Sequence, residues 1–171
     1  MTGKNCFPGI PGARWEPLSS ACRALVTREH SFTTDTLLLA DFSLPRRGEV
    51  CADLGTGCGA IPLLWRERAQ PQKIYAVEIQ EEAARLARTA VEANGFSDRI
   101  EVILGDAGNP KALFRNQSLD LVACNPPYQA AGTGPQGAEE SRSTARHELR
   151  FSLEQLAGTC LLYTSPSPRD S

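Results

Sequence analysis

The sequence lacks a long hydrophobic segment. No uninterrupted apolar run exceeds four residues, as in Leu37–Ala40, whereas a helix that crosses a bilayer needs about 20. Glycine and proline, in place of an apolar stretch, follow Cys6 near the N-terminus, so no secretory signal is visible. We therefore expect a cytoplasmic protein without a membrane-spanning segment.

Histidine is scarce, and the cysteines lack the spacing of a metal site. There are two histidines and six cysteines, with no Cys-x-x-Cys pair. Zinc sites usually need such pairs, so we expect no metal ligands and reduced cysteines that mostly fill the core. A net charge of −2 also gives no global positive field of the kind that attracts nucleic acid.

The composition fits one soluble α/β domain. With 171 residues, 41% apolar and 22% charged, the chain can build one packed core. Apolar runs and helical periodicity alternate between residues 49 and 124, which predicts a mainly parallel sheet with right-handed crossovers. The expected strands are Glu49–Leu54, Lys73–Glu78, Ile100–Leu104 and Leu119–Cys124, and the expected helices are Thr34–Phe42 (capped by Thr33 or Thr34), Ile61–Ala69 and Gln80–Asn94.

We divide the chain into an N-terminal segment, 1–48, a core, 49–159, and a tail, 160–171. Within the core, 129–138 is expected to be a loop, and a last helix is expected from Ser152 to Gly158. Two prolines two residues apart, Pro166 and Pro168, prevent the tail from continuing the domain. The tail resembles a translated sequencing adapter, so we expect that the natural gene was cut near residue 159.

A glycine-rich turn joins the first two core elements. Gly55, Gly57 and Gly59 let the backbone turn sharply and approach a ligand closely. Their spacing is one residue shorter than the dinucleotide fingerprint, and the preceding Asp53 would repel a pyrophosphate. The turn therefore favours a cationic ligand, although a tight loop without a ligand has the same pattern.

Acidic residues also follow the next two strands. Glu78 ends the second strand, where a carboxylate can bind ribose hydroxyls, and Asp106 follows the third, where it could accept from an adenine amino group. Ligands of parallel sheets bind beyond the carboxyl ends of the strands. A solvated strand end is the alternative for Glu78, and a turn cap is the alternative for Asp106.

The most specific motif is the tetrapeptide Asn125, Pro126, Pro127 and Tyr128, directly after the fourth strand. The prolines stiffen the backbone and present carbonyls as acceptors. Asn125 Oδ1 and the Pro126 carbonyl could accept both hydrogens of a planar amine, which frees its lone pair to attack a methyl group, while Tyr128 stacks on the base. An Asx-Pro turn with an exposed tyrosine is the alternative.

These motifs resemble those of a known family. The stretch 53–61 is similar to the S-adenosylmethionine loop of Rossmann-like class I methyltransferases, and the family assigns Glu78 to the ribose and Asp106 to the adenine. The stretches His30–Phe42 and Ala145–Leu149 resemble bacterial enzymes that methylate adenine N6 beside the anticodon of a valine tRNA. In that family the first stretch, with Thr34, lies against the methionine end of the cofactor. The resemblance implies a seven-stranded sheet, of which this chain would lack the C-terminal strands.

Several functions stay open. The first hypothesis is a tRNA N6-adenine methyltransferase, and the second is a glutamine N5-methyltransferase for release factors, which usually has a longer helical region in front. The third is a truncated, inactive cofactor-binding remnant, and a dehydrogenase ranks last. RNA contact is suggested only by a mild N-terminal excess of arginine, which would equally keep a surface soluble. These arginines are Arg14, Arg23, Arg28, Arg46 and Arg47.

Overall fold

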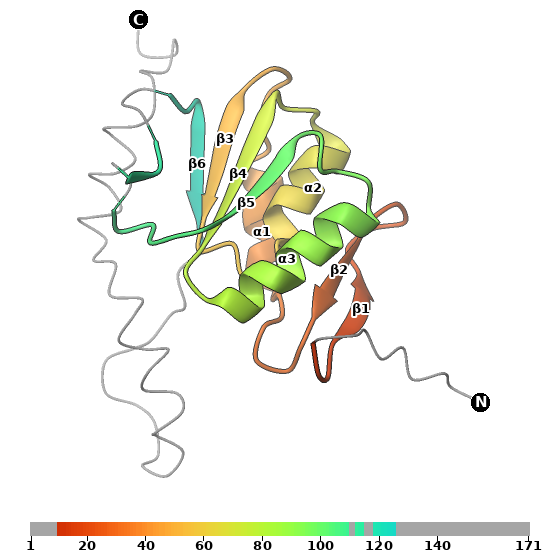
Figure 1. The fold of residues 1–171 in the computed structure, drawn as a ribbon. Helices are drawn as coiled ribbons and strands as arrows, with labels where there is room; N and C mark the ends of the chain where they lie inside the picture. The colour runs from red at the N-terminus through yellow and green to blue at the C-terminus, as the bar shows by residue number, and fades with distance from the viewer. Residues whose placement is uncertain (1–9, 110–111, 115–117, 126–171) are drawn as a thin grey trace, which may run out of the picture.

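The computed structural model describes residues 10–109, 112–114 and 118–125 (Figure 1). Its centre is a parallel sheet of β3 (Val50–Leu54), β4 (Lys73–Glu78), β5 (Ile100–Leu104) and β6 (Leu121–Cys124), with the order β5-β4-β3-β6. Three helices, α1 (Thr34–Phe42), α2 (Ala60–Arg68) and α3 (Glu81–Ala93), connect or precede the strands. The predicted parallel α/β sheet is confirmed.

The predicted element boundaries agree closely with the structure. The bounds of α1, β4 and β5 are those expected from the sequence, and α2 and α3 differ from theirs by one residue at each end. Thr33 is the N-cap of α1. The last strand begins at Leu121, two residues later than expected, and the buried Leu119 that precedes it belongs to a small core on one face of the sheet.

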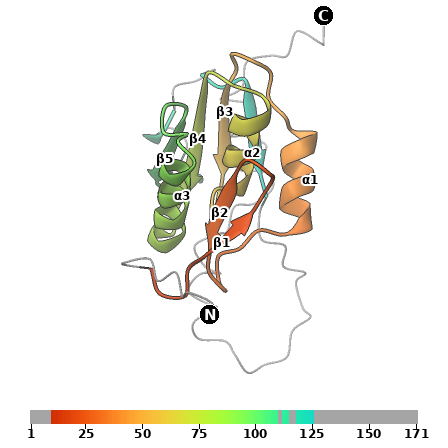
Figure 2. The same ribbon diagram turned by 90° about the vertical axis from the view of Figure 1, so that its right-hand side faces the viewer.

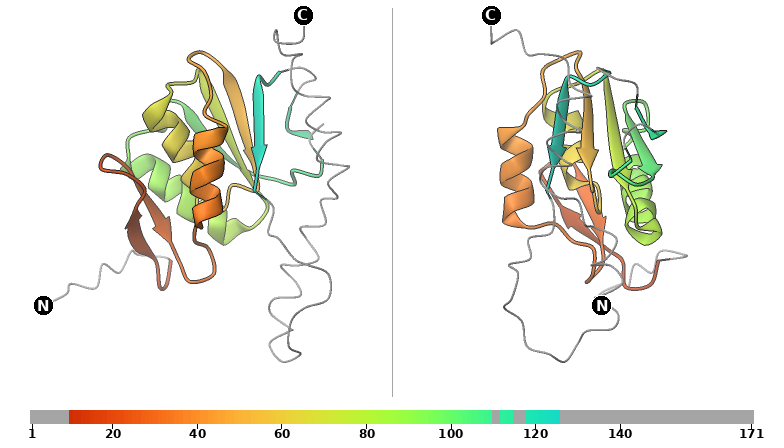
Figure 3. Two further views of the ribbon diagram at one scale, coloured as in Figure 1. Left: turned by 180° about the vertical axis from the view of Figure 1, so that it is seen from behind. Right: turned by 90° about the vertical axis from the view of Figure 1, so that its left-hand side faces the viewer.

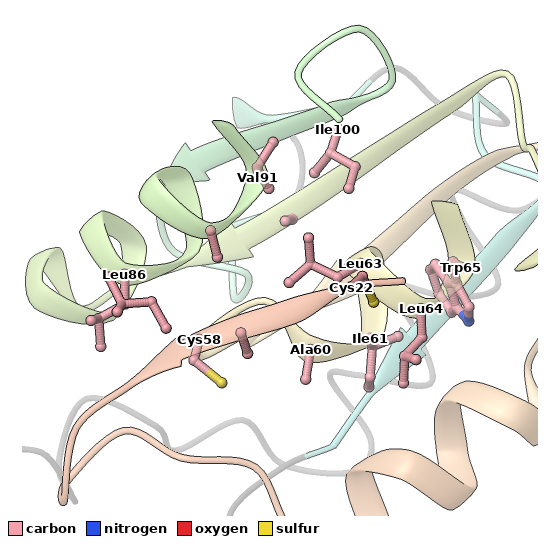
Figure 4. Packing of buried hydrophobic residues seen from close by; sticks show 14 of the residues in the cluster. Cys22, Cys58, Ala60, Ile61, Leu63, Leu64, Trp65, Leu86, Val91 and Ile100 are labelled. Atoms are coloured by element: carbon pink, nitrogen blue, oxygen red, sulfur yellow. The ribbon is translucent and has the colours of Figure 1, made fainter. Parts of the chain in front are cut away.

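All three helices lie on one face of the sheet, as seen when the molecule is turned (Figure 2). Their apolar side chains join alternate strand residues in one core, part of which Figure 4 shows around Trp65 and Leu63. Trp65 is fully buried, and its Nε1 donates to the Ala40 carbonyl at 3.2 Å. This contact, with the ion pair between Arg68 and Asp41 at 3.2 Å, fixes α1 beside α2.

A hairpin that the sequence did not predict covers α2 and α3. Strands β1 (Arg14–Pro17) and β2 (Arg23–Val26) pair antiparallel, and β2 lies against α3 and α2 (Figure 3). The Asn94 side chain binds both backbone groups of Arg23, through Oδ1 at 3.1 Å and Nδ2 at 2.8 Å. Residues of the predicted N-terminal segment, such as Leu25, thus share the core of the helices.

The opposite face of the sheet carries a second, smaller core. Ala52, Leu54, Val77 and Leu119 are buried there, and Phe114 packs against Tyr75 with ring centroids 5.4 Å apart. The chain between β5 and β6 therefore covers part of this face. Among the described residues, β6 ends the row of strands.

Within the described ranges, no helix has the length and apolarity to span a membrane. Four cysteines are described, and none of them forms a disulfide: Cys22, Cys51, Cys58 and Cys124. Three of them are buried, which confirms their packing role. The loop predicted at 129–138, the helix at 152–158 and the tail lie outside the described residues. The division of the chain at 48 and 159 stays a prediction.

Candidate functional site

The glycine loop wraps over the carboxyl end of β4. The amides of Gly55 and Thr56 both donate to the Val77 carbonyl at 2.9 Å, and Gly55, Gly57 and Gly59 all have positive φ angles. A Cβ on Gly55 or Gly57 would meet no other atom within 4 Å. These two glycines therefore supply the backbone conformation and leave open space above the loop.

Gly59 has a different task, at the N-terminus of α2. It is the N-cap, with φ +82°, and a Cβ there would approach the Cβ of Ala87 to 3.1 Å. Glycine thus lets α3 pack close against the loop. Gly59 therefore has a structural role in this arrangement.

Glu78 holds the loop from below. Its Oε2 accepts from the Gly57 amide at 2.7 Å, and its Oε1 accepts from the amides of Ile79 and Gln80, both at 2.9 Å. The side chain is buried, so a solvated strand end is not what the structure shows. A carboxylate has about four acceptor sites, so Glu78 can hold the loop and still accept from a ligand.

Asp53 is a buried acid that makes no hydrogen bond to the other described residues. Its residue is 1% exposed, and neither carboxylate oxygen has a hydrogen-bond partner among the described residues. Burial raises the pKa of Asp53 to about 7, the Thr56 hydroxyl, which is near but makes no hydrogen bond of its own, opposes this rise, and the charge of Glu78 adds to it. An unpaired buried carboxylate is costly, so this group is suited to a cation that enters from outside.

Asn125 directly follows β6, and its side chain contacts the first turn of α1. Its Nδ2 donates to Thr36 Oγ1 at 3.0 Å. Thr36 in turn accepts from the Thr33 amide at 3.2 Å, within a capping box at the helix N-terminus. Because β6 pairs with β3 in register, Asn125 stands beside the glycine loop that follows β3.

An open cavity of about 420 Å³ lies between α1 and the glycine loop. Of the predicted site residues, Asp53, Gly55, Gly57 and Asn125 line it. Nine other lining residues were not predicted as site residues, among them Phe32, Thr36 and Thr56. The Thr33 and Thr36 spacing before an apolar helix was a signal for a cap, but it did not reveal the contact with Asn125.

Four predicted site residues lie outside the lining of the cavity: Thr34, Gly59, Glu78 and Asp106. Asp106 follows β5 at the same edge of the sheet, and its Oδ1 accepts from the Gly108 amide at 2.7 Å. This is the turn cap expected as its alternative role. The remaining motif residues Pro126, Pro127 and Tyr128, and Arg146, His147 and Glu148, lie outside the described residues.

A family model covers most of the chain. The model for the methyltransferase small domain matches residues 30–151. This range contains α1, the glycine loop, the carboxyl edge of the sheet and Asn125, and so includes every residue that lines the cavity.

Curated relatives agree with this match. A tRNA1(Val) (adenine(37)-N6)-methyltransferase of Porphyromonas gingivalis is 35% identical over 121 residues, which are 70% of this chain and 47% of that protein. The protein of the same name from Shewanella halifaxensis is 33% identical over 124 residues, 72% of this chain and 49% of that protein. The chain thus spans about half the length of the curated relatives it matches.

The solved structures show the same fold. A methyltransferase from Thiobacillus denitrificans in complex with S-adenosyl-L-homocysteine matches with a TM-score of 0.56 and 18% identity, covering 80% of this chain and 47% of that one. The predicted class I methyltransferase fold is therefore confirmed.

Proposed function

The chain belongs to the methyltransferase small domain family, and from this premise we propose that it uses S-adenosylmethionine to methylate adenine N6 in a tRNA. The observation that carries the proposal is that Asn125 and the unpaired Asp53 line one cavity. One residue suits an amine that receives a methyl group, and the other suits a cationic methyl donor.

The cavity has the features that this cofactor needs. S-adenosylmethionine carries a sulfonium and an ammonium, and the buried Asp53 carboxylate makes no hydrogen bond to the other described residues. The open space above Gly55 and Gly57 allows an extended ligand to approach the backbone. Ionic pairing in a site of low dielectric is strong, so Asp53 would hold the cationic part of the cofactor.

Two further acids would bind the nucleoside part. Glu78 ends β4, and Asp106 follows β5, so both lie at the carboxyl edge where ligands of parallel sheets bind. Glu78 would accept from ribose hydroxyls with the acceptor sites that its bonds to the loop leave free. Asp106 would accept from the adenine amino group, and Thr34 would lie near the methionine end.

The cofactor supplies an electrophilic methyl group when it is bound, and the chain's own residues orient the acceptor. Asn125 Oδ1 would accept one hydrogen of the adenine amine, and the Pro126 carbonyl would accept the other. This leaves the nitrogen lone pair free for the transfer. Orientation of this kind is worth about 7–11 kcal/mol when the geometry is right. Pro127 would stiffen the corner, and Tyr128 would stack on the base.

The substrate assignment is supported by the curated relatives, whose names specify adenine in a valine tRNA. Two exposed arginines, Arg46 and Arg47, follow α1 and would contact phosphates. Two other arginines of the N-terminal segment have partners within the chain: Arg14 pairs with Glu16 at 2.9 Å, and Arg23 stacks over Trp15 at 4.5 Å.

Transfer of a labelled methyl group tests the proposal. The chain is incubated with labelled S-adenosylmethionine and either valine tRNA or a release factor, and cofactor binding is measured separately by calorimetry. We expect N6-methyladenosine in the tRNA, and we expect Asn125→Ala to abolish it while cofactor affinity stays. Label in the release factor alone would support glutamine methylation, and cofactor binding without transfer would support a binding remnant. Unchanged transfer by Asn125→Ala would refute the role of the motif.

A further inference from the structure

One side-chain contact joins the residue that follows β6 to the first turn of α1. Asn125 Nδ2 donates to Thr36 Oγ1 at 3.0 Å, although the residues are 89 positions apart in the sequence. Both side chains are partly buried and both line the cavity. The contact therefore connects the first turn of α1 to the residue that would grip the acceptor amine.

The Thr36 hydroxyl is itself held in place. It accepts from the Thr33 amide at 3.2 Å and lies 3.3 Å from the Thr33 hydroxyl. A hydroxyl has two acceptor lone pairs and one proton, and these contacts with Asn125 and Thr33 can use all three. Unlike a freely rotating surface hydroxyl, Thr36 is thus a fixed acceptor at the start of a helix.

The helix that carries Thr36 is also fixed at its other end. The Ala40 carbonyl accepts from the buried Trp65 indole at 3.2 Å, and Asp41 pairs with Arg68. Helix α2 begins at the glycine loop. Consequently α1, the loop and Asn125 form one connected frame around the cavity.

We propose that Thr36 is a positioning residue that orients the Asn125 side chain for methyl transfer. The proposal rests on the proposed function. A side-chain amide has two donor hydrogens on nitrogen and an acceptor oxygen. Because Thr36 binds Nδ2 of Asn125, Oδ1 is turned toward the amine that receives the methyl group. The hydrogens of that amine need a hydrogen-bond acceptor, and Oδ1 provides one. Without Thr36 the amide can rotate about its last bond, where the torsion is soft and roughly two-fold.

Three variants separate positioning from simple stabilisation. Thr36→Val keeps the shape but removes the hydroxyl, Thr36→Ser restores a hydroxyl, and Thr89→Val is the matched control. The Thr89 hydroxyl donates to the Arg85 carbonyl within α3, on a helix away from the cavity. We measure kcat and KM for tRNA, the Kd for S-adenosylhomocysteine, and the melting temperature.

We expect Thr36→Val to lower kcat about tenfold, the loss typical of one positioning hydrogen bond. Its cofactor Kd should stay within about twofold, since Thr36 does not provide the charge that binds the cofactor. Thr36→Ser should recover most of kcat, and Thr89→Val should behave as wild type. Loss of kcat in proportion to lost stability in all three variants would overturn the proposal, as would full kcat in Thr36→Val.

A spectroscopic readout keeps the proposal testable if Thr36→Val folds poorly. The side-chain NH₂ protons of Asn125 are assigned by NMR. In the wild-type chain they should exchange slowly with solvent, and their chemical shifts should change in Thr36→Ser. Values typical of a free amide in wild type would overturn the proposal. A wild-type chain that shows the bonded amide but transfers no methyl group would refute the proposed function, and the positioning role would fall with it. This result differs from an active wild type with an indifferent Thr36.

Discussion

The Glu78 carboxylate lies 2.7 Å from the Gly57 amide, so the end of β4 holds the loop that follows β3. The same side chain accepts from the first amides beyond β4. One buried acid therefore fixes the shape of the glycine loop before any ligand binds, and changes at Glu78 should affect both stability and cofactor affinity.

Glu78→Gln should lower the free energy of unfolding by about 1–3 kcal/mol. A glutamine has only one acceptor oxygen, and its NH₂ group would face a backbone amide that it cannot accept from. Chemical denaturation measures the loss. Glu101→Gln is the matched control, because Glu101 forms an ion pair with Lys73 while its side chain is 53% exposed, and such pairs contribute about 0–1 kcal/mol. Equal losses would show that Glu78 does not brace the loop.

Asp53→Asn should change how stability depends on pH. The pKa of Asp53 is raised from 3.8 to about 7, so its stabilising contribution is complete below 3.8 and is lost as the pH rises through about 7. Between about pH 4 and pH 7 the melting temperature of the cofactor-free wild type should therefore fall relative to that of Asp53→Asn. Parallel curves would contradict this prediction.

Cofactor binding should show the opposite trend at the same group. A cation beside Asp53 favours the ionised carboxylate, so affinity for S-adenosylmethionine should rise from about pH 6 to about pH 8, by up to about tenfold per unit below the pKa. Calorimetry at several pH values measures this. In Asp53→Asn the affinity should be weaker and should lose the part of its pH dependence that comes from Asp53. The same slope in both proteins would remove Asp53 from the site.

Gly59→Ala should destabilise the chain more than Gly48→Ala. Both glycines have positive φ, +82° and +86°, but only at Gly59 does a Cβ meet another atom, Ala87 Cβ at 3.1 Å. The backbone strain costs about 1–2 kcal/mol at either site, and the crowding at Gly59 should add about 1–3 kcal/mol. Thermal melts compare them. A smaller loss at Gly59 would show that α3 can move away from the loop.

Asn94→Ala should loosen the hairpin from α3. The variant removes both bonds to the Arg23 backbone, so the Arg23 amide should exchange with solvent faster while amides of β3 stay protected. Asn94→Asp, which keeps an acceptor for that amide, should have a smaller effect. Unchanged exchange at Arg23 in Asn94→Ala would mean that packing alone holds the hairpin.

Much of this fold could be predicted because local signals agree with the tertiary structure. The strand Lys73–Glu78 is a buried apolar run between turn residues, and α3 has apolar residues on one face, so pattern and burial coincide. The hairpin was missed because β1 has only four residues, includes Pro17, and is no more than half-buried. Its position depends on Asn94 and on α3, which lie far along the chain.

The sequence predicted which acidic residues lie at the candidate site, but not the hydrogen bonds that join its parts. The ends of the predicted strands placed Asp53, Glu78 and Asp106 at the carboxyl edge of the sheet, because the carboxyl ends of parallel strands lie at the same edge. The register of β3 with β4 and β6 determines two contacts. One is the hydrogen bond from the Gly57 amide to Glu78, and the other is the hydrogen bond from Asn125 to Thr36. No local pattern specifies such a register.

The most direct measurement is a crystal structure of the chain with sinefungin, in which an amine replaces the transferable methyl group. We predict that this amine lies about 2.7–3.2 Å from Asn125 Oδ1, with the ligand's cationic end against Asp53 and its ribose against Glu78. A ligand bound outside the cavity, or an Asn125 amide turned away from the ligand's amine, would contradict the proposed methyl transfer.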